Sequence, residues 1–205
     1  MAEAHRHHRP ALPGAARFDG LVGDVDPAVR SEAADQCATL LVRGPRVDGD
    51  AEIIERVVRL AETEGLDEIA ELWSGSPPDS LAGCLWRLYL LRTWVYADPE
   101  SAAREFDLGR RHSPVHEVVA GVSDPPGPAD VQWLVDTVLR GVRIGEFADT
   151  LFRAAAFARV TAAGRAHHDH GDTSSYRSDV SASRLMTMAD QLESAARLEL
   201  EGRLA

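Results

Sequence analysis

Two pairs of glutamates in the first third of the chain have a spacing that suits a divalent cation. Glu52 and Glu55 are three residues apart, and so are Glu68 and Glu71. Residues at positions i and i+3 of a helix share a face, so two such helices side by side would present four carboxylates to one ion. Hard cations such as magnesium prefer oxygen ligands of this kind. One interpretation of the chain is therefore a metal-dependent nucleotide or phosphoester hydrolase.

This spacing resembles the E-x-x-E…E-x-x-D pattern of the MazG-type nucleotide pyrophosphohydrolases, which are all-helical. In that family magnesium binds the diphosphate of the nucleotide, and the resemblance implies the same chemistry here. It covers four residues, and Glu71 stands where the family has aspartate. Residues 18–80 hold 15 acids and 5 arginines, so these glutamates also fit solvated helix faces.

A second candidate metal site consists of four neighbouring residues: His167, His168, Asp169 and His170. Imidazole and carboxylate are ligands for zinc or iron, which would again support a hydrolase. However, adjacent residues such as His167 and His168 cannot face one helical site together. We expect these residues in a polar loop over residues 165–178. The alternative to a metal site is that this loop is only a linker. His112 and His116 lie elsewhere, and we expect no pairing between them on one helical face.

Two arginines stand among aromatic residues, and a third interpretation follows from them. Arg87 and Arg92 are interleaved with Trp86 and Trp94. Arginine beside aromatic rings can hold a phosphate or carboxylate, or stack on a ring, so these residues could form a site for a small anionic ligand. A buried charge without a partner is costly, so we expect internal ion pairs with acids of the helices before residue 80.

Other motifs of catalysis are missing from the sequence. There is no G-x-S-x-G elbow, no glycine-rich phosphate loop and no E-x-x-H pair. All 22 basic residues are arginine, so lysine cannot serve as a nucleophile or base.

With neither lysine nor asparagine and only four isoleucines, the composition indicates a GC-rich bacterial genome. We expect no cofactor. The formal net charge of −11 disfavours nucleic acid as a partner.

The pattern along the chain is helical throughout. Asp26-Pro27 and Asp98-Pro99 are typical helix starts, and glycines follow several apolar stripes. No segment alternates with period two for long enough to form a strand, so we expect an all-α protein. The predicted helices span about 26–44, 50–65, 66–73, 81–97, 98–109, 113–121, 129–142, 146–163 and 179–202.

Residues 81–97 are apolar on nearly every side, which predicts a central buried helix. We therefore expect a single bundle of about eight or nine helices around it. The domain organisation would be a flexible tail over 1–23, a helical domain over 24–164, a polar loop over 165–178 and a C-terminal helix over 179–205.

Cys37 and Cys84 fall on apolar faces, which indicates a reducing, cytoplasmic location. Arg87 and Arg92 interrupt the most apolar stretch, so we expect no membrane partner.

Residues 77–94, 120–128 and 140–164 together resemble a family of helical proteins of about 200 residues from GC-rich Gram-positive bacteria. Some members carry the name RNA polymerase beta subunit. The resemblance implies a helical fold and, at most, an accessory role near the polymerase, and it transfers no functional residue.

The sequence as a whole favours a non-enzymatic module that binds another protein or associates with itself. The acidic residues 18–80 would complement a basic patch on a partner. The last helix would dock on the bundle or on a partner.

Overall fold

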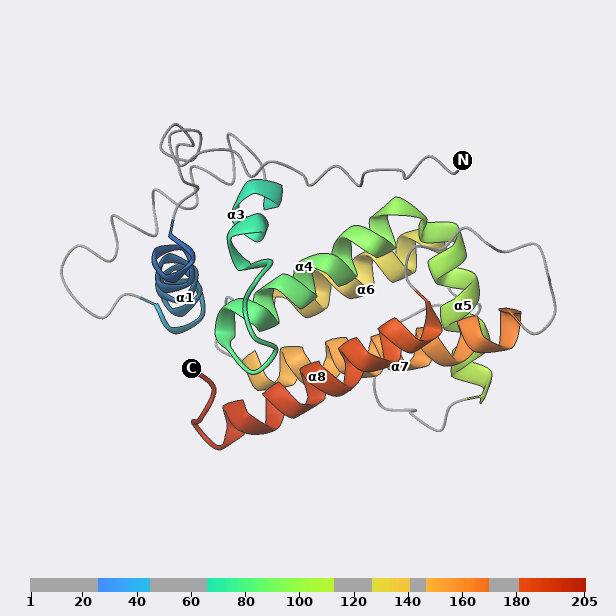
Figure 1. Ribbon diagram of the computed structural model, residues 1–205. Coiled ribbons are helices and arrows are strands. Elements are labelled where there is room, and N and C mark those ends of the chain that lie inside the picture. The colour runs from blue at the N-terminus through green and yellow to red at the C-terminus, as the bar shows by residue number, and fades with distance from the viewer. Residues whose placement is uncertain (1–25, 45–65, 113–126, 141–146, 170–180) are drawn as a thin grey trace, which may run out of the picture.

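The computed structural model describes residues 26–44, 66–112, 127–140, 147–169 and 181–205, and within these ranges it contains seven α-helices and no strand (Figure 1). The all-α prediction is confirmed. Two predicted helices, 50–65 and 113–121, lie outside the described residues. The helices are α1 (Pro27–Arg43), α3 (Leu66–Trp73), α4 (Leu81–Ala97), α5 (Pro99–His112), α6 (Pro128–Arg140), α7 (Phe147–Asp169) and α8 (Ala182–Leu200).

Helix starts follow the capping signals in the sequence. The Asp26 carboxylate accepts a hydrogen bond from the Ala28 N–H at 2.9 Å, and the Ser80 hydroxyl accepts one from the Gly83 N–H at 3.1 Å. Such side chains satisfy backbone donors that the first turn of a helix leaves unpaired. At the other end of α1, Gly44 has φ +75°, a conformation that glycine adopts without strain.

Two helices run past the glycines that were expected to end them. α5 continues beyond Gly109 to His112, and α7 continues beyond Gly164 to Asp169. The predicted loop over 165–178 is therefore helical in its first five residues. In both helices the glycine is an interior residue at the place where α5 and α7 meet.

α4, α6, α7 and α8 form two layers, and α1 and α3 pack on α4 (Figure 1). In one layer α8 runs antiparallel to α7, and α5 crosses α7 near its C-terminal end; in the other layer α4 lies beside α6. The most extensive packing joins α7 to α8 and α5 to α7. α8 buries Leu185, Ala189, Leu192, Ala195 and Ala196. The last helix therefore docks on its own chain.

α5 and α7 touch through their backbones. A Cβ atom added at Gly109 would lie 1.8 Å from the Val160 carbonyl oxygen, and one added at Gly164 would lie 1.7 Å from the Glu105 carbonyl oxygen. Real side chains never approach so closely, so both positions require glycine. Beside this crossing the rings of Phe106 and Phe157 stack with centroids 5.1 Å apart.

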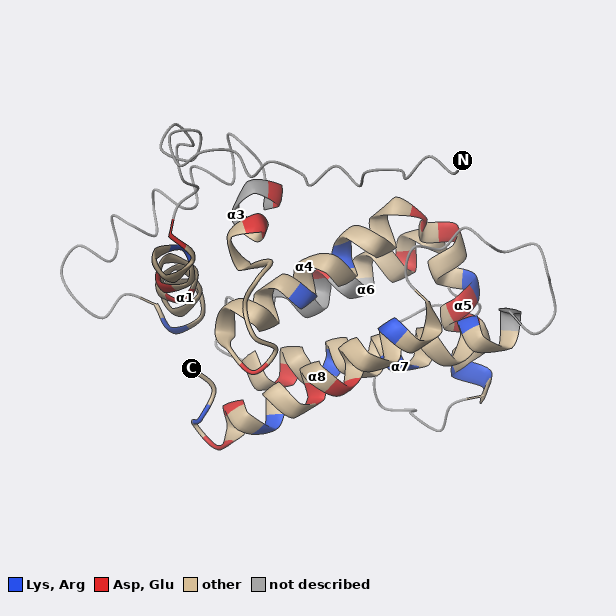
Figure 2. Ribbon diagram, viewed as in Figure 1, with Lys and Arg blue, Asp and Glu red and all other residues tan. Residues whose placement is uncertain are grey.

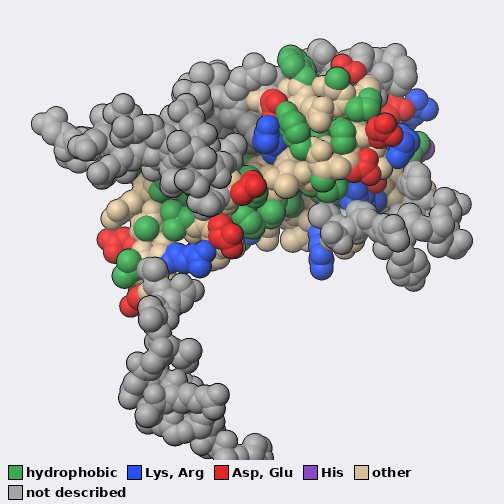
Figure 3. All heavy atoms as spheres, turned by 90° about the horizontal axis from the view of Figure 1, so that it is seen from above, with side chains coloured by type: hydrophobic (Ala, Val, Ile, Leu, Met, Phe, Trp, Pro, Cys, Tyr) green, Lys and Arg blue, Asp and Glu red, His purple; other side chains and the backbone are tan. Residues whose placement is uncertain are grey.

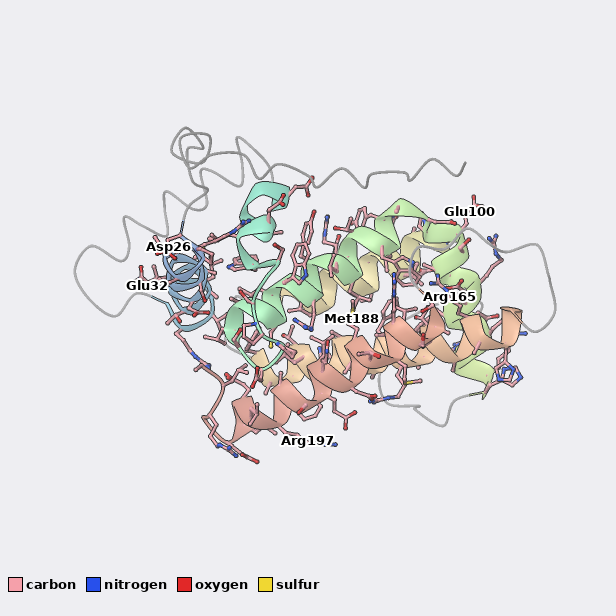
Figure 4. The ribbon with its side chains drawn as sticks, in the orientation of Figure 1. Asp26, Glu32, Glu100, Arg165, Met188 and Arg197 are labelled. Carbon is pink, nitrogen blue, oxygen red and sulfur yellow. The ribbon has the colours of Figure 1, made fainter. Side chains whose placement is uncertain are left out.

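A buried ion pair lies at the same crossing. The Arg165 Nη2 atom is 2.8 Å from Glu105 Oε2, and the side chains are 5 % and 12 % exposed respectively. The Arg165 guanidinium also lies 4.9 Å from the centre of the Trp94 ring on α4. Arg165 thus stands where α4, α5 and α7 meet (Figure 4). Charges so well shielded from water need this fixed pairing.

α4 contacts all six other described helices, which agrees with its predicted central place. Its first five residues, from Leu81 to Leu85, are buried, whereas Thr93 and Tyr96 near its end are exposed.

Cys37 and Cys84 are buried free thiols, and burial raises the pKa of Cys84 to about 12. No helix in the described ranges combines the length and apolar character needed to cross a membrane.

Replacing either crossing glycine by alanine should destabilise the protein by about 3 kcal/mol or more, because the two backbones must separate to admit a methyl group. Urea unfolding of Gly109→Ala and Gly164→Ala measures this loss. Gly75→Ala is the control, since nothing lies within 4 Å of a Cβ at that position. Equal stability of all three variants would contradict the crossing.

Removing one partner of the buried ion pair should cost more than removing both. Arg165→Met leaves the Glu105 carboxylate buried without its arginine, which typically costs about 3–5 kcal/mol. The double variant Arg165→Met/Glu105→Leu should regain much of that loss, because no charge then remains to be desolvated. A double variant less stable than Arg165→Met, again by urea unfolding, would show that the pair is not buried as described.

Candidate functional site

Three side chains join the C-terminal half of α4 to α6. The Arg92 Nε–H donates a hydrogen bond to Asp136 Oδ1 at 3.1 Å, and the Tyr96 hydroxyl donates one to Asp136 Oδ2 at 2.5 Å. The Arg92 guanidinium also lies 4.1 Å from the centre of the Tyr96 ring. Each of the three groups therefore restricts the other two, although all of them reach the surface.

Trp133 extends this cluster along α6. It lies three residues before Asp136, on the same face of the helix. Trp133 is 49 % exposed and Tyr96 is 38 % exposed, which makes them two of the few exposed large hydrophobic residues in the described ranges. We name Arg92, Tyr96, Trp133 and Asp136 the α4–α6 aromatic surface.

The surface combines apolar rings with charges of both signs. Seen from above, hydrophobic side chains lie among acidic and basic ones on this side of the molecule (Figure 3). Arg92 and Asp136 are each 35 % exposed, so their attraction alone adds little stability. Their effect is on geometry, because the pair holds the Tyr96 ring in place. The hydrogen bond to Asp136 raises the pKa of Tyr96 above its ordinary value.

Each of the four residues of the predicted anion site contacts a different group in the structure. The Arg87 Nε–H donates to Gln191 Oε1 on α8 at 2.7 Å, and Arg87 Nη1 donates to the Gly83 carbonyl oxygen at 2.8 Å. Partial burial lowers the pKa of Arg87. Trp86 stacks on Tyr89, with ring centroids 5.5 Å apart. Trp94 faces Arg165, and Arg92 faces α6.

The expected ion pairs with acids of the helices before residue 80 are not found in the described residues. Arg92 pairs with Asp136 of α6, and Arg87 bonds to neutral groups. The acidic α3 instead reaches α4 through Tyr89, whose hydroxyl donates to Asp67 Oδ1 at 2.6 Å. That a small anion binds at Arg87 stays a prediction.

The carboxylate metal site also stays a prediction. Glu52 and Glu55 lie outside the described residues, as does the side chain of Glu68. Glu71 is exposed on α3, and its carbonyl oxygen accepts hydrogen bonds from Arg30 and from Ser74.

The histidine cluster is divided in a similar way. His167 is an exposed residue of α7, and the side chains of His168, Asp169 and His170 are outside the described part of the chain. The structure brings His167 to His112, with ring centroids 4.3 Å apart. Among the described residues, no three His, Cys, Asp or Glu side chains converge on one point.

No protein-family model, curated protein or solved structure matches the chain. The resemblance of residues 77–94, 120–128 and 140–164 to helical proteins of GC-rich bacteria thus stays a prediction.

Trp133 and Asp136 were missed as candidate residues at the sequence level. Their spacing places both on one face of a helix, which was the available signal. This spacing alone does not indicate a site, because only the structure places α6 beside Tyr96 and Arg92.

Asp136→Asn should lower the pKa of Tyr96, because the negative charge that accepts its hydrogen bond is lost. A raised pKa in the folded state stabilises the fold below the unfolded value of about 10, and this contribution is lost as the pH rises through the folded value. The stability of Asp136→Asn should therefore fall less than that of the parent at high pH.

NMR titration of tyrosine ring carbons would measure this shift. Tyr89 is an internal control, since its pKa is raised by a different carboxylate, Asp67. A Tyr96 titration unchanged by Asp136→Asn would show that the α4–α6 hydrogen bond does not form in solution.

Proposed function

We propose that the protein is a non-enzymatic interaction module and that the α4–α6 aromatic surface binds a second copy of the same chain. The observation that carries this proposal is the half-exposed Trp133 beside the fixed cluster of Arg92, Tyr96 and Asp136. Tryptophan, tyrosine and arginine are the residues that most often dominate binding energy at protein interfaces. Here all three types occur together on one face.

Preorganisation supports the same proposal. Ordering a mobile side chain at an interface costs about 0.5–1.5 kcal/mol. In this cluster Arg92 and Tyr96 are already restrained by Asp136 and by each other, so much of that cost has been met before a partner arrives. A surface of this kind is suited to binding rather than to catalysis.

A second copy is favoured as the partner because the surface is self-complementary. In a two-fold symmetric dimer the same patch faces itself. Arg92 of one copy can then approach Asp136 of the other, while the Trp133 and Tyr96 rings supply apolar contact. A surface with one sign of charge would not allow this arrangement.

The overall charge sets a condition on this association. Two chains that each carry a formal net charge of −11 repel each other at long range. Moderate salt screens this repulsion, while contacts between aromatic rings that the dimer interface buries are little affected. We therefore expect association to strengthen as salt rises from low to physiological concentration.

Trp133→Ala should weaken dimerisation at least about tenfold, because it removes the largest exposed ring of the surface. Analytical ultracentrifugation over a wide concentration range measures the dissociation constant. Leu200→Ala is the matched control, since Leu200 is a 69 % exposed apolar residue on α8 and outside the surface.

Tyr96→Ala should behave like Trp133→Ala, and Leu200→Ala should behave like the parent chain. A parent chain that stays monomeric at the highest concentration would overturn the proposal. Equal weakening by Trp133→Ala and Leu200→Ala would also overturn it, because binding would then not depend on this surface.

A further inference from the structure

The crossing of α5 and α7 brings together two histidines that are far apart in the sequence. His112 lies three residues after Gly109, and His167 lies three residues after Gly164. Residues at i and i+3 share a helix face, so each imidazole lies one turn beyond the backbone contact and on the side of the other helix. Their rings are tilted by 30° with centroids 4.3 Å apart, and both residues are exposed.

One of the two rings is held in the form that binds a metal. His112 Nδ1 lies 2.8 Å from the Leu108 carbonyl oxygen. A carbonyl oxygen only accepts hydrogen bonds, so Nδ1 carries a proton, and in the neutral ring the lone pair is then on Nε2. Metal-binding histidines commonly have their second nitrogen fixed by such a carbonyl.

We propose that His112 and His167 form a two-histidine site for a divalent transition-metal ion, with Zn²⁺ as the representative ion. Zinc–nitrogen bonds are about 2.0–2.1 Å long, so two ligating nitrogens lie within about 4 Å of each other. Because the ring centroids are 4.3 Å apart, rotations about the side-chain bonds can bring one nitrogen of each ring within this distance. Water fills the remaining positions.

The neighbouring charges favour a transition metal over magnesium or calcium. Asp107 is the nearest carboxylate in the sequence on α5, and it is engaged by Arg110 at 3.2 Å and by Arg111 at 2.5 Å. Among the described residues the ligands at this crossing are therefore imidazoles, which suit zinc, copper and nickel, whereas magnesium and calcium prefer oxygen ligands. A bound ion would connect the last turns of α5 and α7 and so stabilise their crossing.

The test is calorimetric titration of the untagged chain with Zn²⁺ alone. The reference variant replaces the six other histidines by glutamine: His5, His7, His8, His116, His168 and His170. We expect this variant to bind one Zn²⁺ per chain and to unfold at a higher temperature when Zn²⁺ is present.

Adding His112→Ala or His167→Ala to the reference variant should weaken binding about tenfold or more and abolish the thermal shift. The double variant should lose no more than either single one, because both histidines hold the same ion. Both side chains are exposed, so unfolding without metal serves as the control for folding and should stay unchanged.

Two results would overturn the proposal. One is a reference variant without saturable Zn²⁺ binding, since the ion would then depend on the other histidines. The other is a double variant whose loss equals the sum of the single losses, since the two rings would then act independently.

Discussion

At Gly109 and Gly164 the backbones of α5 and α7 touch, and neither position has room for a methyl group. The contact fixes the distance between Glu105 and Arg165, which lie within one turn of it and are shielded from water. A buried ion pair stabilises a fold only when its geometry is good, and this crossing supplies that geometry. α4, α6 and α8 pack against α7, whereas α1 and α3 pack on α4.

The layer formed by α4 and α6 also contacts the α5–α7 crossing. Trp94 of α4 lies against the Arg165 guanidinium, so the charge that joins α5 to α7 also locates α4. Figure 2 shows further charged residues along α5 and α8. The ion pair between Arg159 of α7 and Asp190 of α8 is more exposed than the pair at the crossing. Two residues after Trp94, α4 presents Tyr96 to Asp136 of α6, which completes the α4–α6 aromatic surface. The α4–α6 aromatic surface therefore includes a helix that also contacts the α5–α7 crossing.

The sequence was sufficient for the fold class and for most helix starts, because caps such as Asp26 and Ser80 act locally. It misplaced two helix ends for one reason. Glycine after an apolar stripe usually ends a helix, yet Gly109 and Gly164 are small because another backbone lies against them. Partners between helices could not be derived either: Arg92 was assigned to acids before residue 80, whereas its partner is Asp136. Such pairings depend on how helices are arranged, which local patterns do not specify.

Native-state hydrogen exchange tests the central role of the crossing most directly. The account predicts that the amides from Phe106 to Gly109 and from Val160 to Arg165 exchange only through global unfolding and are among the slowest in the protein. The amides of α1, which lies at the edge of the bundle (Figure 1), should exchange through smaller openings. If the amides at the crossing exchange as fast as those of α1, the contact between α5 and α7 does not hold the structure together.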